Sequence, residues 1–106
     1  MTNEDLIRTI KGIQYIVINT CHGGFGLSPD AKEKYKQLAG ITDPDWHDCE
    51  IARDDPYLVR IVHKMGAEAN SVYADLKIVE VPAGVEWTIE EYDGKEWVAE
   101  IHRTWR

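Results

Sequence analysis

Hydrophobic positions divide the chain into segments with strand and helix patterns. Tyr15–Ile18 is a continuous apolar run of aromatic and β-branched side chains, which is typical of a central strand buried on both faces. Leu76–Val81 predicts a second strand, which ends at Pro82. Val85–Trp105 follows as a β-hairpin around Asp93-Gly94.

Two helices are predicted between these strands, because both segments have clear start and stop residues. Ser28-Pro29 supplies an N-cap and a first-turn proline, Ala31–Leu38 continues as the helix, and Gly40 ends it. Asp55–Gly66 has the same order of cap, proline, apolar stripe and glycine. Ile41–Asp54 has no clear periodicity and is expected to be a loop.

This order of elements predicts an α+β fold, with a small antiparallel or mixed sheet, a C-terminal hairpin and two helices packed on one face. The 106 residues fit a single domain spanning 1–106. Residues 1–12 are expected to be an N-terminal arm, either helical or flexible.

Two registers are possible for the hairpin. A two-residue Asp93-Gly94 loop would pair Ile89 with Val98 and mix apolar and acidic groups on both faces. A three-residue loop with Gly94 in a left-handed position pairs Glu91 with Lys95 instead. It gathers the apolar side chains on one face (Val85, Trp87, Ile89, Trp97, Ala99 and Ile101) and places Glu90, Glu96 and Glu100 on the other. Because the buried pattern sets the register, we expect the three-residue loop.

Composition narrows the classes of partner. Twelve Lys and Arg against nineteen Asp and Glu give a formal net charge of −7, which disfavours long nucleic acids and anionic membranes. A single nucleotide stays compatible, since a few local cations suffice for it. No segment has the apolar length of a signal peptide or a membrane span, and two cysteines do not make a disulfide framework. We therefore expect a cytoplasmic protein.

The stretch CHGGFGLS contains the main candidate for a ligand site. Gly23, Gly24 and Gly26 lie between a predicted strand and a helix N-terminus, where unpaired N–H groups can hold an anion. The alternative is a tight strand-to-helix connection with Phe25 in the core. The candidate ligand contacts from this loop are His22, Gly23, Gly24, Phe25, Gly26 and Ser28.

Cationic and aromatic residues elsewhere could complete such a site. Arg53 either pairs with Asp54 or Asp55 or reaches a phosphate or carboxylate. In the tail, His102, Arg103 and Trp105 suit phosphate pairing and base stacking. The tail matters for function only if it meets the glycine loop.

Catalytic and metal chemistry have weaker support. Cys21 and His22 are adjacent, but neighbours on a strand point to opposite faces, and a nucleophilic thiol needs a base and an oxyanion site as well. The acidic segment from Asp43 to Glu50 matches no zinc or calcium spacing. We therefore expect no metal and no cofactor, and we assign no catalytic residue.

Three blocks of the sequence resemble small uncharacterised bacteriophage and prophage proteins. They are NxCxGGFGLS from Asn19 to Ser28, RxDPxLV from Arg53 to Val59, and YDGxExVxExHRTW from Tyr92 to Trp105. Phage proteins of this size often act against host defences, and one class of them, the sponges, binds nucleotide immune signals without cleaving them. The resemblance implies a role of this kind.

The leading hypothesis is a homo-oligomeric protein that binds a small phosphorylated ligand, such as a cyclic nucleotide or an ADP-ribose-like molecule, without turnover. One alternative is a small hydrolase or transferase that uses Cys21 or His22. Another is an acidic inhibitor of a host protein, in which Glu90, Glu96 and Glu100 on the hairpin mimic a nucleic-acid backbone.

Overall fold

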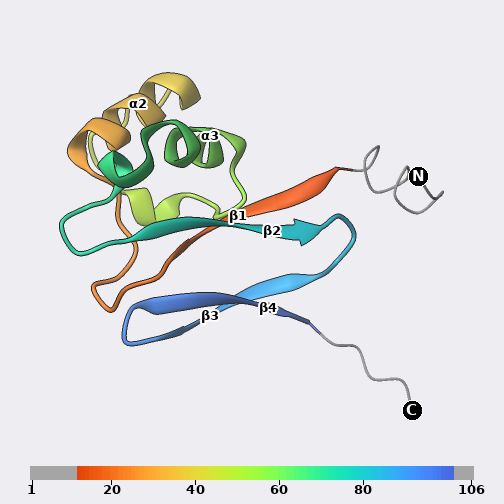
Figure 1. Cartoon of the computed structure of the whole chain (residues 1–106). Helices are drawn as coiled ribbons and strands as arrows, with labels where there is room; N and C mark the ends of the chain where they lie inside the picture. The colour runs from red at the N-terminus through yellow and green to blue at the C-terminus, as the bar shows by residue number, and fades with distance from the viewer. Residues whose placement is uncertain (1–11, 102–106) are drawn as a thin grey trace, which may run out of the picture.

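A computed structural model describes residues 12–101 of the chain (Figure 1). The predicted arm at residues 1–12 lies almost entirely outside this range. The elements follow in the order β1 (Ile13–Asn19), α2 (Pro29–Ala39), η1 (Asp48–Glu50), α3 (Pro56–Met65), η2 (Gly66–Ala69), β2 (Leu76–Pro82), β3 (Trp87–Tyr92) and β4 (Lys95–Glu100). The predicted α+β class is confirmed, with four antiparallel strands arranged as two two-stranded sheets.

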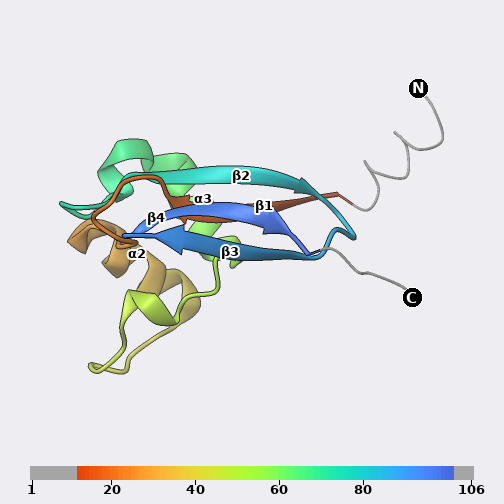
Figure 2. The ribbon, with the colours of Figure 1, turned by 90° about the horizontal axis from the view of Figure 1, so that it is seen from below.

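The β1–β2 sheet lies between the helices and the β3–β4 hairpin (Figures 1 and 2). Strand β1 pairs with β2 from Ile13 opposite Pro82 to Asn19 opposite Leu76. Its Val17 belongs to the core cluster that includes α2 and α3. Its Ile16 packs on the other side, toward the hairpin. Strand β1 is therefore buried on both faces along its second half, as predicted.

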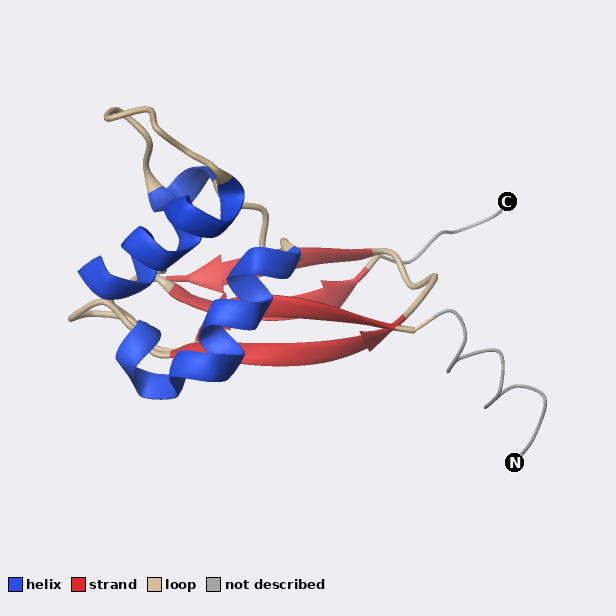
Figure 3. Cartoon of the chain, turned by 90° about the horizontal axis from the view of Figure 1, so that it is seen from above, coloured by secondary structure: helices blue, strands red, loops and turns tan. Residues whose placement is uncertain are grey.

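Both helices begin and end as their flanking residues predict. The Ser28 side chain accepts a hydrogen bond from Ala31 N–H, and Gly40 ends α2 with φ at 70°. Asp55 accepts hydrogen bonds from the backbone at the start of α3. Seen from above, the helices cover only part of the strands, which extend beyond them (Figure 3). The start of β1 lies in the part that the helices leave uncovered.

The hairpin has the two-residue register, so the expected three-residue loop is wrong. Tyr92 pairs with Lys95, and Ile89 pairs with Val98. Asp93 and Gly94 both have positive φ, at 51° and 88°, as a type I′ turn requires. The twist of that turn matches the twist of the strands, and this local preference prevails over the separation of apolar from acidic side chains.

The register reverses two predicted orientations on β4. Trp97 is 43% exposed and donates from its indole nitrogen to Glu90, at 3.1 Å. Glu96 points inward and pairs with Arg53. The prediction that Trp97 belongs to a buried apolar face and Glu96 to an exposed acidic face is therefore wrong. An inward carboxylate is tolerated here because a guanidinium meets it.

Candidate functional site

The glycine loop packs closely against other segments of the protein. A Cβ at Gly23 would lie 1.9 Å from the carbonyl oxygen of Tyr73, and one at Gly26 would lie 2.7 Å from Ser71 Oγ. The hairpin turn approaches from the other side, where a Cβ at Gly94 would lie 2.6 Å from the carbonyl oxygen of His22. Glycines at these positions allow backbone segments to meet, which is an architectural role.

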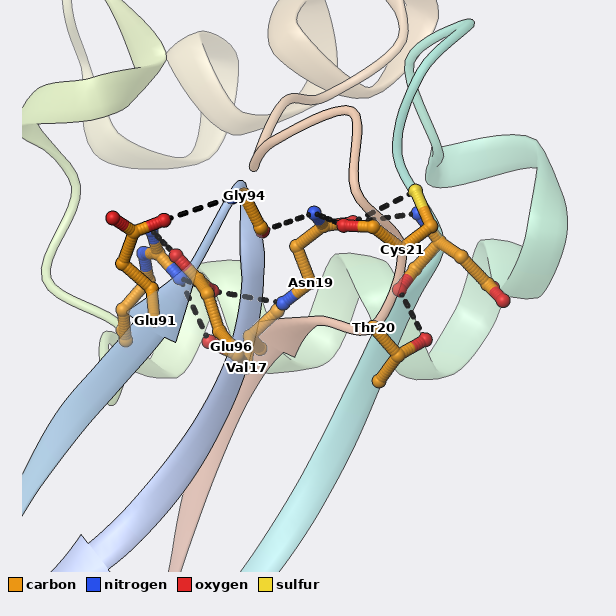
Figure 4. Close-up of polar contacts among 9 residues, drawn as sticks. Val17, Asn19, Thr20, Cys21, Glu91, Gly94 and Glu96 are labelled. Carbon is orange, nitrogen blue, oxygen red and sulfur yellow. Dashed lines mark hydrogen bonds and ion pairs between the residues drawn. The ribbon is translucent and has the colours of Figure 1, made fainter.

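Asn19 connects the segments around this loop (Figure 4). Its fully buried side chain donates to the carbonyl oxygens of Cys21, at 2.7 Å, and of Gly94, at 2.8 Å. Its Oδ1 accepts from the N–H of Asp75, at 2.8 Å. This structural role of Asn19 was not predicted from the sequence. Its only signal was an amide side chain directly after the buried run of β1.

Acceptors of the protein itself occupy the start of α2. The N–H of Leu27 donates to Asp48 Oδ2, at 2.9 Å. Ser28 Oγ donates to the carbonyl of Glu68, at 2.7 Å, and caps the helix. Lys32 Nζ lies 3.9 Å from Asp48. The Asp48 carboxylate thus holds a position that the sequence analysis assigned to a ligand anion.

Arg53 meets Glu96 rather than the neighbouring aspartates. Its Nη2 donates to Glu96 Oε2 at 2.8 Å, and its Nη1 donates to Glu96 Oε1. The guanidinium also lies 3.8 Å from the centre of the Phe25 ring. The predicted ion pair of Arg53 with Asp54 or Asp55 is therefore wrong, and Glu96 neutralises its charge inside the fold.

The remaining residues predicted for this site are distributed as follows. His22 Nδ1 lies 4.0 Å from Asp93 Oδ2, and Cys21 Sγ donates to the carbonyl of Tyr73 at 2.8 Å. His102, Arg103 and Trp105 lie outside the described residues. The structure therefore brings the glycine loop and Arg53 together, but uses most of their polar groups within the protein. Ligand binding there stays a prediction.

A groove at the opposite end of β1 offers a different candidate. It has a volume of about 1090 Å³ and lies between α3 and the β1–β2 sheet. Strand β1 contributes its first residues, Ile13–Tyr15, and β2 contributes Lys77–Glu80. Pro56, Val59, Arg60 and His63 line the groove from α3, with Asp54 just before that helix.

The helical period explains this lining. Positions 56, 59, 60 and 63 recur on one face of a helix, while Leu58, Ile61 and Val62 face the core. The apolar stripe therefore anchors α3 and directs Arg60 and His63 into the groove. From the sequence only the apolar stripe of this helix was recognised and Arg60 and His63 were given no role, so the groove was missed. Only the spacing of Arg60 and His63 hinted at a shared face.

Basic and acidic side chains both line the groove. Arg60 and His63 lie on the face of α3 that lines it, with the acids Asp54 and Glu80 nearby. Lys77 is also part of the lining, but it pairs with Ile18, so its side chain lies on the hairpin face of the sheet. Within residues 12–101, Arg60 and His63 form no ion pair, since the pairs present involve Arg53, Lys32 and His22. The charge of Arg60 is therefore available to a ligand, although the chain carries a net charge of −7.

The floor of the groove combines aromatic and aliphatic surface. Tyr15 is 42% exposed and Ile13 39% exposed, at the start of β1 where the helices no longer cover the sheet (Figure 3). Val59 and Ile78 add further apolar surface. A phenol ring in the same groove as the unpaired Arg60 suits a ligand with a planar ring and an anionic group.

Comparisons of the chain with family models, with curated proteins and with solved structures find no significant match. The helices of the described part are all too short or too polar to cross a membrane. Across residues 12–101, no three His, Cys, Asp or Glu side chains gather in a way that could hold a metal ion.

Proposed function

We propose that the protein binds a small phosphorylated, nucleotide-like ligand in the groove between α3 and the β1–β2 sheet, without turnover. The observation that carries this proposal is the presence of Arg60 and His63 on the α3 wall of one groove, with no ion pair to any acid in residues 12–101. The Arg60 guanidinium pairs with phosphate oxygens, and His63 adds an imidazole donor.

The groove suits a nucleotide better than a bare anion. Tyr15 presents an exposed ring on which a base can stack, and Val59 and Ile78 provide apolar surface beside it. A long nucleic acid would carry its charge over the rest of the acidic surface, where the net charge of −7 repels it. The groove therefore favours one small ligand over a polymer.

The resemblance to bacteriophage and prophage proteins gives this proposal a biological setting. In that setting the protein acts in the cytoplasm of a host cell as a sponge for a nucleotide immune signal. Cyclic nucleotides and ADP-ribose-like molecules are the ligands to test first. The rest of the proposal does not depend on the host.

Isothermal titration calorimetry against cyclic, linear and ADP-ribose-type nucleotides tests the proposal. We expect one nucleotide class to bind, and chromatography of the mixture after binding to recover that ligand unchanged. Conversion of the ligand would indicate an enzyme. Absence of heat with every nucleotide would contradict the proposal and leave the protein-inhibitor alternative.

A further inference from the structure

A second groove adjoins the first. It has a volume of about 410 Å³ and lies between α2 and α3. Helix α2 contributes Lys34, Gln37 and Leu38, and α3 contributes Arg60, Ile61, Lys64 and Met65. Arg60 lines both grooves, so the two meet at this side chain.

The exposed face of α3 places one basic side chain on each side of this meeting point. His63 and Lys64 follow Arg60 by three and four positions, so each lies one turn away from it, with Cβ separations of about 5–6 Å. His63 lines the first groove and Lys64 the second. Lys34 adds a charge to the second groove, which has no acidic residue in its lining.

We infer that the ligand carries two separate phosphate groups, one in each groove, with Arg60 between them. This inference rests on the proposed function and specifies its ligand class. One phosphate lies by Arg60 and His63, beside the ring of Tyr15. The other lies by Lys34 and Lys64. A monophosphate uses only the first groove.

The inference predicts that a second phosphate strengthens binding, whereas the net charge alone predicts that it weakens binding. The protein carries a charge of −7, so a second phosphate should weaken binding if the long-range field decides the affinity. If Lys34 and Lys64 receive that phosphate, the second group strengthens binding instead. Two charge-assisted contacts correspond to a gain of about tenfold or more.

The test compares adenosine monophosphate with adenosine 3′,5′-bisphosphate by calorimetry, at one ionic strength. The double variant Lys34→Ala/Lys64→Ala should bind the bisphosphate about tenfold more weakly and leave monophosphate binding within about twofold. The matched control Lys36→Ala/Lys95→Ala removes the same charge outside both grooves, and should leave both affinities near wild type.

The outcomes separate this inference from the function on which it rests. Equal loss for both ligands, or no loss for either, overturns the two-phosphate inference while the proposed function stands. Failure of the wild type to bind either ligand contradicts the two-phosphate inference, whereas only the absence of heat with every nucleotide contradicts the proposed function. A bisphosphate preference that the Lys34→Ala/Lys64→Ala variant abolishes supports both.

Discussion

Arg53 and Glu96 lie 43 residues apart in the sequence and form a two-point ion pair between the segment before α3 and strand β4. The same carboxylate accepts from the N–H of Asn19, at 2.9 Å, at the end of β1. Glu96 therefore joins the hairpin to both other layers of the fold. This contact, rather than a ligand, accounts for the arginine before the α3 cap.

The pair is expected to stabilise the fold. Glu96→Gln keeps the shape of the side chain but leaves the mostly buried guanidinium of Arg53 without a counter-charge. We expect the free energy of unfolding to fall by about 2–4 kcal/mol. Chemical denaturation measures it, with Glu100→Gln, an exposed position on the same strand, as the control. Equal stability of the two variants would contradict the role assigned to Glu96.

The glycine loop is expected to respond to substitution according to its packing. Gly23→Ala meets the backbone of Tyr73, so we expect a loss of about 3 kcal/mol. Gly24 and Gly84 have φ values of +94° and +90° with open space around them, so alanine at either costs about 1–2 kcal/mol. Thermal and chemical unfolding of the three variants measures the loss of stability in each.

Gly84, far from the loop, serves as the matched control for Gly24. Equal stability and equal ligand affinity of Gly24→Ala and Gly84→Ala are the expected result. A selective loss of nucleotide affinity in Gly24→Ala would return the ligand site to the glycine loop.

The limits of the helices could be predicted from the sequence because they depend on neighbours in the chain. Ser28, Gly40 and Asp55 act within a few residues of where they stand. The hairpin register also depends on a local signal, the Asp93-Gly94 turn, but the hydrophobic pattern favoured the other register. The inward position of Glu96 depends on Arg53. Hydrophobic patterning could not predict this position, because Arg53 is distant in the sequence.

The candidate site was missed for a similar reason. Arg60 and His63 share a helix face with one another, but they become a site only when β1 and β2 form the opposite wall. The glycine loop had the stronger local pattern. That pattern is explained by contacts with Tyr73, Ser71 and the turn at Gly94, all of which are distant in the sequence.

The pH dependence of stability should report on Tyr35. Burial, together with the hydrogen bond to Asp55 Oδ2 at 2.8 Å, raises the pKa of Tyr35 to about 12. The unfolded chain loses this proton near pH 10, so its contribution to stability is complete below pH 10 and is lost as the pH rises toward 12. The slope is at most about 1.4 kcal/mol per pH unit.

Tyr35→Phe should therefore lose stability less steeply than the wild type between pH 10 and pH 12. Denaturation at several pH values in this interval measures the slope. Tyr92→Phe, at an exposed position, should keep the slope of the wild type. Parallel curves for Tyr35→Phe and wild type would contradict the assignment.

Self-association is predicted through the outer face of the hairpin. Trp97 is 43% exposed and Tyr92 73% exposed, and within residues 12–101 strand β3 pairs only with β4. Such a face, with an open strand edge, favours contact with a second copy. Light scattering should give a mass above that of the monomer, and Trp97→Ala should reduce it.

Trp87→Ala provides the contrast, because Trp87 packs inward and donates to Gln14 at 2.9 Å. This substitution should lower the free energy of unfolding by about 2–4 kcal/mol. It should leave the outer face, and therefore self-association of the folded protein, unchanged. A monomeric mass for the wild type over a wide concentration range would rule out the predicted association.

The central claim is that Arg60 and its groove hold the phosphate of a nucleotide. Arg60 is exposed and forms no ion pair within residues 12–101, so Arg60→Ala should fold normally. Calorimetric titration of this variant with the best-bound nucleotide is the most direct measurement, with Lys95→Ala as the charge-matched control. We predict affinity about 10- to 100-fold weaker for Arg60→Ala and unchanged for Lys95→Ala. Equal affinity of both variants and the wild type would contradict the claim.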